Sequence, residues 1–183
     1  MVVRTLLANR ILVVLLVALL LSASQSVGQD AAVGQAQATV LAVLQVTAAS
    51  SLDFGNVMQG VRKSIANSND SAAVFEISGE AGAGIEAYLQ LPEYMSISDN
   101  SDRMRITFGA TDCSIDTTGA GSPSGMTSGK GWQNENPYSL PSAIILGSLG
   151  TDFYLGGTVW PSVSQRAGSY TADIIITVAY NGN

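Results

Sequence analysis

The amino-acid sequence predicts an all-β protein, an antiparallel β-sandwich that follows a cleaved N-terminal signal helix. Three observations carry this prediction. Short segments of alternating apolar and polar residues recur along the chain, bounded by Gly, Pro, Asn and Ser turns. No segment after the leader has the periodicity of an amphipathic helix. The last segment, Ser169 to Tyr180, carries an unbroken period-two apolar stripe, which is typical of a strand buried on one face.

The start of the chain has the organisation of a secretory signal peptide. Arg4 and Arg10 supply positive charge, residues 11–21 are all apolar, and small and polar residues follow. A run of eleven apolar residues is too short for a bilayer core, which takes about 20 helical residues, so a membrane anchor is the weaker interpretation. We therefore expect a signal peptide at 1–28, a flexible leader at 29–36, and export to the periplasm, the cell surface or the medium.

Removal of the signal peptide leaves a strongly acidic chain. We expect the cleavage site between Ser24 and Gln29 or, alternatively, near Ala36. All 14 acidic residues lie at or beyond Asp30, whereas two of the eight basic residues leave with the leader. The net charge therefore changes from −6 to −8. Nucleic acids and anionic lipids attract Lys and Arg, so we expect no nucleic-acid partner and no membrane span in the mature protein.

The residue inventory predicts no catalytic, metal or cofactor site. Histidine, the commonest general base and metal ligand, is absent from the sequence. The acidic turn from Asp99 to Asp102 lacks the Gly and the distal Glu of an EF-hand loop, and we interpret it as a turn cap. Cys113 is the only cysteine, and we expect a partly buried or adventitious thiol rather than a disulfide to another chain. The protein is therefore predicted to be non-enzymatic.

The domain is predicted to span residues 37–183, and its first half shows regular strand signals. Residues 37–47 are rich in Val and Thr, which favours a strand over a helix. This segment is either the first strand of its own sandwich, which we prefer, or a donor strand for a neighbouring subunit. Leu52 and Phe54 alternate before Gly55. The further strands expected in this half are 61–66, 71–78, 85–91 and 103–108.

The second half opens with a long Gly/Ser-rich segment. Residues 110–142 contain five glycines and few β-branched apolar residues, which predicts a loop, with room for a brief hairpin. Short apolar strands are expected at 143–149 and 152–160, and the Gly156–Gly157 dipeptide predicts a bend within the second. Pro161 then ends the pattern before the C-terminal strand.

The C-terminal stripe is the clearest strand signature in the chain. Its alternating positions after Gly168 share one face, namely Tyr170, Ala172, Ile174, Ile176, Val178 and Tyr180. Such a stripe is buried against a core.

Several short motifs in order carry a family resemblance. They are Ala-Thr-Val at 38–40, Leu-Asp-Phe-Gly at 52–55, Phe-Glu-Ile-Ser-Gly at 75–79, Gly-Gly-Thr-Val at 156–159, and Gly-Ser-Tyr-Thr-Ala at 168–172 leading to Val-Ala-Tyr at 178–180. Together they resemble a family of exported bacterial domains of unknown function that is similar to the spore coat protein U and fimbrial-subunit group. The resemblance implies an immunoglobulin-like sandwich and a surface or pilus-like role.

The same resemblance implies partners for the C-terminal strand. Fimbrial subunits of the chaperone–usher type end in a strand with a glycine twelve residues before a near-terminal tyrosine, and Gly168 and Tyr180 match that spacing. The implied partners are further copies or related subunits, joined by strand pairing, and a periplasmic chaperone. The resemblance implies that Gly168 and the stripe residues form the pairing strand, because a strand added at a sheet edge gains main-chain hydrogen bonds and places alternate side chains in pockets. The cysteine pair of those subunits is absent, and three residues follow Tyr180 where the usual tail is shorter.

Two functions are therefore expected. The first is a structural or adhesive surface protein of fimbrial type. The alternative is a soluble exported module that recognises a glycan or another ligand through residues 110–142. Trp132, Tyr138 and Trp160 are its candidate ligand-binding aromatics, unless they serve to pack the loop against the sandwich.

Overall fold

The computed structural model describes residues 35, 37–119, 121–125 and 131–182, and the chain divides into two units, Met1–Thr39 and Val40–Asn183. The predicted signal peptide lies outside the described residues, as does the predicted leader apart from residue 35. Among the described residues, no helix is long and apolar enough to cross a membrane. The described part of the second unit consists of strands and one short 3-10 helix, η1 (Pro123–Gly125).

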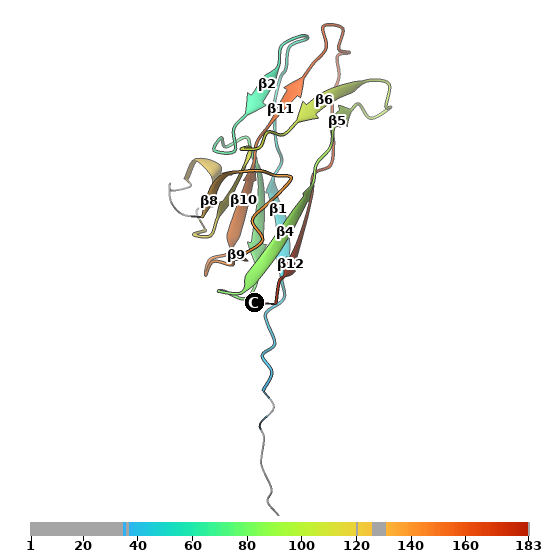
Figure 1. The fold of residues 1–183 in the computed structure, drawn as a ribbon. Helices are drawn as coiled ribbons and strands as arrows, with labels where there is room; N and C mark the ends of the chain where they lie inside the picture. The colour runs from blue at the N-terminus through green and yellow to red at the C-terminus, as the bar shows by residue number, and fades with distance from the viewer. Residues whose placement is uncertain (1–34, 36, 120, 126–130, 183) are drawn as a thin grey trace, which may run out of the picture. The chain divides into compact units, whose positions relative to one another are not determined.

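The strands form three sheets, each with antiparallel pairing (Figure 1). Sheet A has the order β1 (Gln45–Ser50), β3 (Ala73–Ser78), β10 (Thr151–Leu155), β7 (Cys113–Asp116) and β8 (Trp132–Glu135). Sheet B has the order β2 (Lys63–Ile65), β11 (Gly157–Trp160), β6 (Arg103–Thr107) and β5 (Tyr94–Ser96). Sheet C has the order β12 (Ile175–Tyr180), β4 (Gly84–Gln90) and β9 (Ile144–Ile145).

One hydrophobic core joins the inward faces of the three sheets. It contains alternate residues from the strands of each sheet, among them Phe75, Ile77, Ile115, Phe153 and Leu155 of sheet A, Met104, Ile106 and Val159 of sheet B, and Ile85, Leu89 and Ile144 of sheet C. Each fully buried side chain of this size contributes about 1.5–3 kcal/mol of transfer free energy. The predicted fold class, an antiparallel all-β sandwich, is confirmed.

Strands β10 and β11 are one run of chain that leaves sheet A and enters sheet B at Gly156. A Cβ on Gly156 would lie 2.7 Å from the backbone nitrogen of Asn67 and nearer still to the carbonyl oxygen of Ile65. The Gly156 N–H donates to the carbonyl of Asp112 at 2.8 Å, which holds the bend in place. The bend that the Gly156–Gly157 dipeptide predicts is therefore confirmed, and it couples the two sheets.

The structure differs from the expected strands in three segments. Residues 37–44 lie outside any strand, because Gln45 pairs with Ser78, the last residue of β3, and no ladder position remains for them. The segment 110–142 contains the antiparallel pair of β7 and β8, which confirms the brief hairpin within the predicted loop, but β7 is fully buried rather than part of a surface loop. Of the expected strand at 169–180, only Ile175–Tyr180 is a strand.

Candidate functional site: the open edge between β1 and β12

Strand β12 lies at the edge of sheet C, because β4 is its only strand partner among the described residues. The N–H of Asn181 donates to the carbonyl of Gly84 at 3.1 Å, in the register that pairs Tyr180 with Ile85. Hydrogen-bonded and non-bonded pairs alternate along an antiparallel ladder. The backbone groups of Ile176, Val178 and Tyr180 therefore point away from β4, toward the unpaired side.

Strand β1 is an edge strand as well, and among the described residues only β3 pairs with it. Its sequence, QVTAAS, contains neither charge nor proline, and all six residues are exposed. Natural edge strands are usually protected from further pairing by charge, proline, bulges or short length. A bulge between Ala48 and Ser50 is the only such device in β1, and β12 has no charged residue.

The unpaired sides of β1 and β12 lie next to each other at both ends. At one end, the Tyr180 hydroxyl is 2.9 Å from the carbonyl oxygen of Ala42, just before β1. At the other end, a cavity of about 220 Å³ separates Ala48 and Ser50 from Ile174. No ladder joins the two strands in the described part of the chain. We call this region, the facing sides of Gln45–Ser50 and Ile175–Tyr180 with the cavity, the open edge.

The cavity of the open edge reaches the hydrophobic core. Its lining includes Phe75 and Ile106, both buried core residues, together with Leu52, Phe54 and Met95. The open edge is therefore an apolar slot between two sheets, bordered by backbone groups on at least the β12 side.

Tyr180 closes one end of the open edge. Its hydroxyl accepts a hydrogen bond from the N–H of Glu80 at 2.7 Å and donates to Ala42. The ring passes directly over Gly79, where a Cβ would collide with the hydroxyl and lie 3.0 Å from a methyl group of Leu44. The residue at position 79 is therefore glycine because Tyr180 and Leu44 occupy the space of a side chain.

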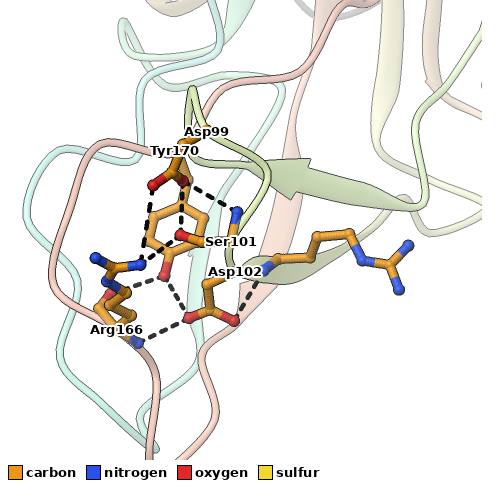
Figure 2. A network of polar contacts seen from close by, with 6 residues as sticks. Asp99, Ser101, Asp102, Arg166 and Tyr170 are labelled. Carbon is orange, nitrogen blue, oxygen red and sulfur yellow. Dashed lines mark hydrogen bonds and ion pairs between the residues drawn. The ribbon is translucent and has the colours of Figure 1, made fainter.

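A polar network holds the other end, where the chain approaches β12 (Figure 2). The Asp102 carboxylate accepts hydrogen bonds from the Tyr170 hydroxyl at 2.7 Å, from the side-chain amide of Gln165 at 2.7 Å and from the N–H of Arg166 at 2.8 Å. The backbones of Ser96 and Thr171 exchange two hydrogen bonds of 2.9 Å. These contacts tie the segment before β12 to the turn between β5 and β6.

The same network sets the protonation of its carboxylates. The hydrogen bond from Tyr170, followed by the N–H of Arg166, lowers the pKa of Asp102 below its ordinary value. The hydroxyl and then the N–H of Ser101 lower the pKa of Asp99. Asp99 accepts both bonds, at 2.6 and 3.0 Å, which confirms the interpretation of the acidic turn as a capped turn.

The residues predicted to form the pairing strand divide into two groups. Ile174, Ile176, Val178 and Tyr180 are half-buried and pack against the core, as the stripe predicts, and Tyr170 does so from the loop before them. Ala172 is exposed and lines the cavity instead, and Gly168 lies in the preceding loop. The stripe therefore holds over 174–180 and is interrupted at Ala172, because residues 168–174 follow the network of Asp102 rather than a strand ladder.

The three aromatic residues predicted to bind a ligand do not lie together on the 110–142 segment. Trp132 is half-buried in β8 and packs against the core. Trp160 lies in β11, and its indole N–H donates to the Thr107 hydroxyl at 2.8 Å. Tyr138 is exposed and lines a second cavity together with Tyr94 of β5. Trp132 therefore packs the segment 110–142 against the sandwich, which was the alternative to ligand binding, whereas Tyr138 lies beside sheet B.

The sequence pattern did not indicate that two aspartates are buried. Asp116 of β7 and Asp152 of β10 are paired across the ladder. Burial is the main cause that raises the pKa of Asp152, and the charge of Asp116 adds to it. Asp116 has one carboxylate oxygen that is buried without a hydrogen-bond partner among the described residues. The described residues contain no group of three His, Cys, Asp or Glu side chains that could hold a metal ion.

The single cysteine lies in the core. Cys113 begins β7 and is fully buried, and burial raises the pKa of its thiol to about 12. The thiolate is the nucleophile in disulfide exchange, so this thiol is inert while the domain is folded. The thiol is therefore fully buried, where a partly buried or adventitious one was expected.

Comparison with known proteins identifies the family of the chain. No curated protein matches the chain. A family model described as a domain of unknown function, DUF4402, matches residues 59–180. The match begins before β2 and ends on Tyr180, the last residue of β12, so that β1 lies outside it. The chain therefore belongs to the DUF4402 family of domains of unknown function.

Proposed function

We propose that the protein is a non-enzymatic structural or adhesive surface protein that assembles by accepting a strand from another chain into the open edge. The observation that carries this proposal is the pair of six-residue, uncharged edge strands, β1 and β12, beside a cavity that reaches the core. The resemblance to the spore coat protein U and fimbrial-subunit group points to the same function. In this proposal the protein is exported, and a periplasmic chaperone covers the open edge before assembly.

The acceptor side of the proposal is β12. An added strand would hydrogen-bond the outward backbone groups of Ile176, Val178 and Tyr180, which β4 leaves unpaired. Its alternate side chains would enter the slot and cover Ile174, Ile176 and Val178, which are half-buried. Burial of this apolar surface would stabilise the complex by about 25 cal/mol for each Å² removed from water.

The donor side is the segment just before β1 in a second copy or a related subunit. Val40 and Val43 are 93% and 83% exposed, and residues 40–44 lie outside any strand. The segment VLAVL carries no charge, and its β-branched residues favour an extended conformation. An apolar, unpaired segment next to an unpaired edge is the complement that strand addition between identical chains requires.

A matched pair of substitutions in β1 tests the proposal. Ala48 lines the cavity of the open edge, whereas its neighbour Ala49 does not line it, and both are exposed. Ala48→Arg places a charge where the donated side chains would lie, while Ala49→Arg adds the same charge beside the cavity. We expect native mass spectrometry of the protein from cells expressing the full-length gene to show multimers for the wild type and Ala49→Arg, and monomers for Ala48→Arg.

Two outcomes would contradict strand addition. The first is a wild-type protein that stays monomeric at every concentration tested. The second is a set of multimers that Ala48→Arg and Ala49→Arg affect equally, which would place the interface elsewhere. Thermal unfolding of each variant shows whether the fold is intact. Cell fractionation tests the location, because a protein that stays in the cytoplasm with its N-terminal segment uncleaved cannot act at the surface.

A further inference from the structure

Sheet B presents a row of aromatic and basic side chains on the face turned away from the core. Val159 and Ile106 point into the core, so the residues that alternate with them point outward. The register places Trp160 opposite Arg105 on one side, and Tyr94 opposite Arg105 on the other. Arg105 therefore lies between two aromatic side chains, in a line across β11, β6 and β5.

Two more arginines stack on this row. The Arg62 guanidinium lies 5.5 Å from the centroid of the Trp160 ring, and the Arg103 guanidinium lies 4.9 Å from that of Tyr94. Cation–π contacts of this kind hold both partners in defined orientations. We call the set the aromatic–arginine face, made up of Arg62, Trp160, Arg105, Tyr94 and Arg103.

The aromatic–arginine face is positively charged in an acidic protein. The full chain has a net charge of −6, yet three of its eight basic residues lie on this one face. Within the described residues the ion pair that forms is between Arg166 and Asp99, and none of the three arginines has a carboxylate partner. Their guanidinium groups are therefore available for an external anion, which arginine binds through two parallel N–H donors.

A cavity of about 420 Å³ adjoins the face. Its lining includes Tyr94 and Arg105 from the row, together with Glu93, Thr107 and Tyr138. Tyr138 lies in the segment that follows β8. Tyr138, Tyr94 and Trp160 are 60%, 43% and 41% exposed, which is unusual for large aromatic side chains gathered near each other. The cavity thus combines aromatic surfaces with one cation, one carboxylate and the hydroxyl groups of Thr107 and the two tyrosines.

We propose that the aromatic–arginine face binds an acidic polysaccharide, a chain of pyranose rings that carry carboxylate or sulfate groups. One strand, β6, lies between Trp160 of β11 and Tyr94 of β5, so the two aromatic residues are two inter-strand distances apart, about 10 Å. The two rings can therefore stack on the apolar faces of two different sugars in one extended chain. Arg105, between them, meets the anionic group, while Glu93 accepts hydrogen bonds from sugar hydroxyls. An acidic peptide offers the charges but no flat apolar rings for the aromatic side chains.

Binding of four defined polymers to the protein from cells expressing the full-length gene tests this proposal. Polygalacturonate presents carboxylates, dextran sulfate presents sulfates, dextran is the neutral polysaccharide, and polyglutamate is the acidic peptide. We expect one or both acidic polysaccharides to bind at least about tenfold more tightly than dextran and polyglutamate, since only they match both features of the face. Their ranking shows whether carboxylate or sulfate is preferred.

Matched variants locate the binding site. Arg105→Gln and Arg166→Gln remove the same charge, but Arg166 lies beside Asp99, outside the face. We expect Arg105→Gln and Tyr94→Ala each to weaken binding about tenfold, and Arg166→Gln to change it less than about twofold. Arg105→Lys keeps the charge without the two-pronged donor and is expected to bind more weakly than the wild type.

The proposal is overturned if polyglutamate binds as tightly as the acidic polysaccharides, if none of the polymers binds at low salt, or if Arg105→Gln and Arg166→Gln have equal effects. Thermal unfolding confirms that the variants are folded. The outcome is independent of strand addition, because Ala48→Arg lies on sheet A and should bind the polysaccharide as the wild type does.

Discussion

The outer strands of sheet B and the strands of the open edge all have unpaired backbone groups that could pair with another chain, but their sequences and lengths differ. β2 and β5, at the edges of sheet B, have three residues each, and Arg62 and Lys63 stand at the start of β2. β1 and β12 have six residues each and no charge. Short, charged edges resist further pairing, whereas long uncharged ones invite it. In our two proposals, sheet B accordingly offers side chains to a ligand, while the open edge offers backbone groups to an added strand.

The largest effect is expected at the bend that joins sheet A, which contains β1, to sheet B. Gly156→Ala introduces a Cβ against the backbone of Ile65 and Asn67, which cannot move without breaking sheet B. We expect a loss of about 3 kcal/mol in the free energy of unfolding, measured by urea denaturation. Gly109→Ala is the control, because its Cβ would meet only Asp112 at 3.5 Å, and it should change stability by less than about 0.5 kcal/mol. Equal effects would show that the bend at Gly156 is not required.

Amide hydrogen exchange distinguishes the two sides of β12. The N–H groups of Ile176 and Val178 point to the open edge, whereas those of Thr177 and Ala179 bond to β4. In the monomer we expect the first pair to exchange at least about tenfold faster, a difference of about 1.4 kcal/mol in protection. In multimers the difference should disappear. Uniform protection in the monomer would mean that something already covers the edge.

A smaller effect is expected at the closed end of the open edge. Tyr180→Phe removes the hydroxyl that bonds Glu80 and Ala42, which should cost about 1 kcal/mol of stability. Tyr88→Phe is the matched control, because Tyr88 lies on the same sheet with its side chain 59% exposed. If both substitutions leave the unfolding free energy unchanged, Tyr180 does not hold the segment before β1 against β12.

The smallest effects concern two aspartates with opposite pH dependence. The pKa of Asp102 is lowered in the folded state, so its carboxylate stabilises the fold above pH 3.8, and this contribution is lost as the pH falls through the folded pKa. The pKa of Asp152 is raised, so its ionised form destabilises the fold as the pH rises from 3.8 through the folded pKa.

Thermal unfolding of Asp102→Asn and Asp152→Asn measures this contrast. Near pH 7, Asp102→Asn should lower the Tm, because it removes a carboxylate whose pKa the fold lowers, and Asp152→Asn should raise it, because it removes one whose pKa burial raises. Both differences should shrink below pH 3.8. A lower Tm for Asp152→Asn near pH 7 would show that the buried carboxylate is stabilising and that its hydrogen bonds to Gly121 and Tyr154 outweigh its burial.

Much of the fold could be predicted from local pattern, and much of the candidate site could not. The alternation of Ala73, Phe75 and Ile77 and the bend at Gly156 depend on neighbouring residues, and the structure confirms both. The sequence pattern does not mark β7 as a buried strand, because the polar residues Ser114 and Asp116 alternate with Cys113 and Ile115. Both polar side chains are buried in the structure, where they accept hydrogen bonds from the N–H groups of Asn134 and Thr118. The period-two pattern predicts a strand at Tyr170. In the structure this residue lies in a loop, where its hydroxyl donates a hydrogen bond to Asp102, a residue distant in sequence.

The sequence by itself determined the all-β class, most of the strands and the apolar stripe that ends at Tyr180, because a period of two and its turn residues are local properties of the chain. Only the tertiary structure decided which strand edges stay unpaired and which side chains share a face. Residues 94, 105 and 160 meet in one row, and residues 48 and 174 line one cavity, because cross-strand register and sheet packing bring together segments that the sequence keeps far apart.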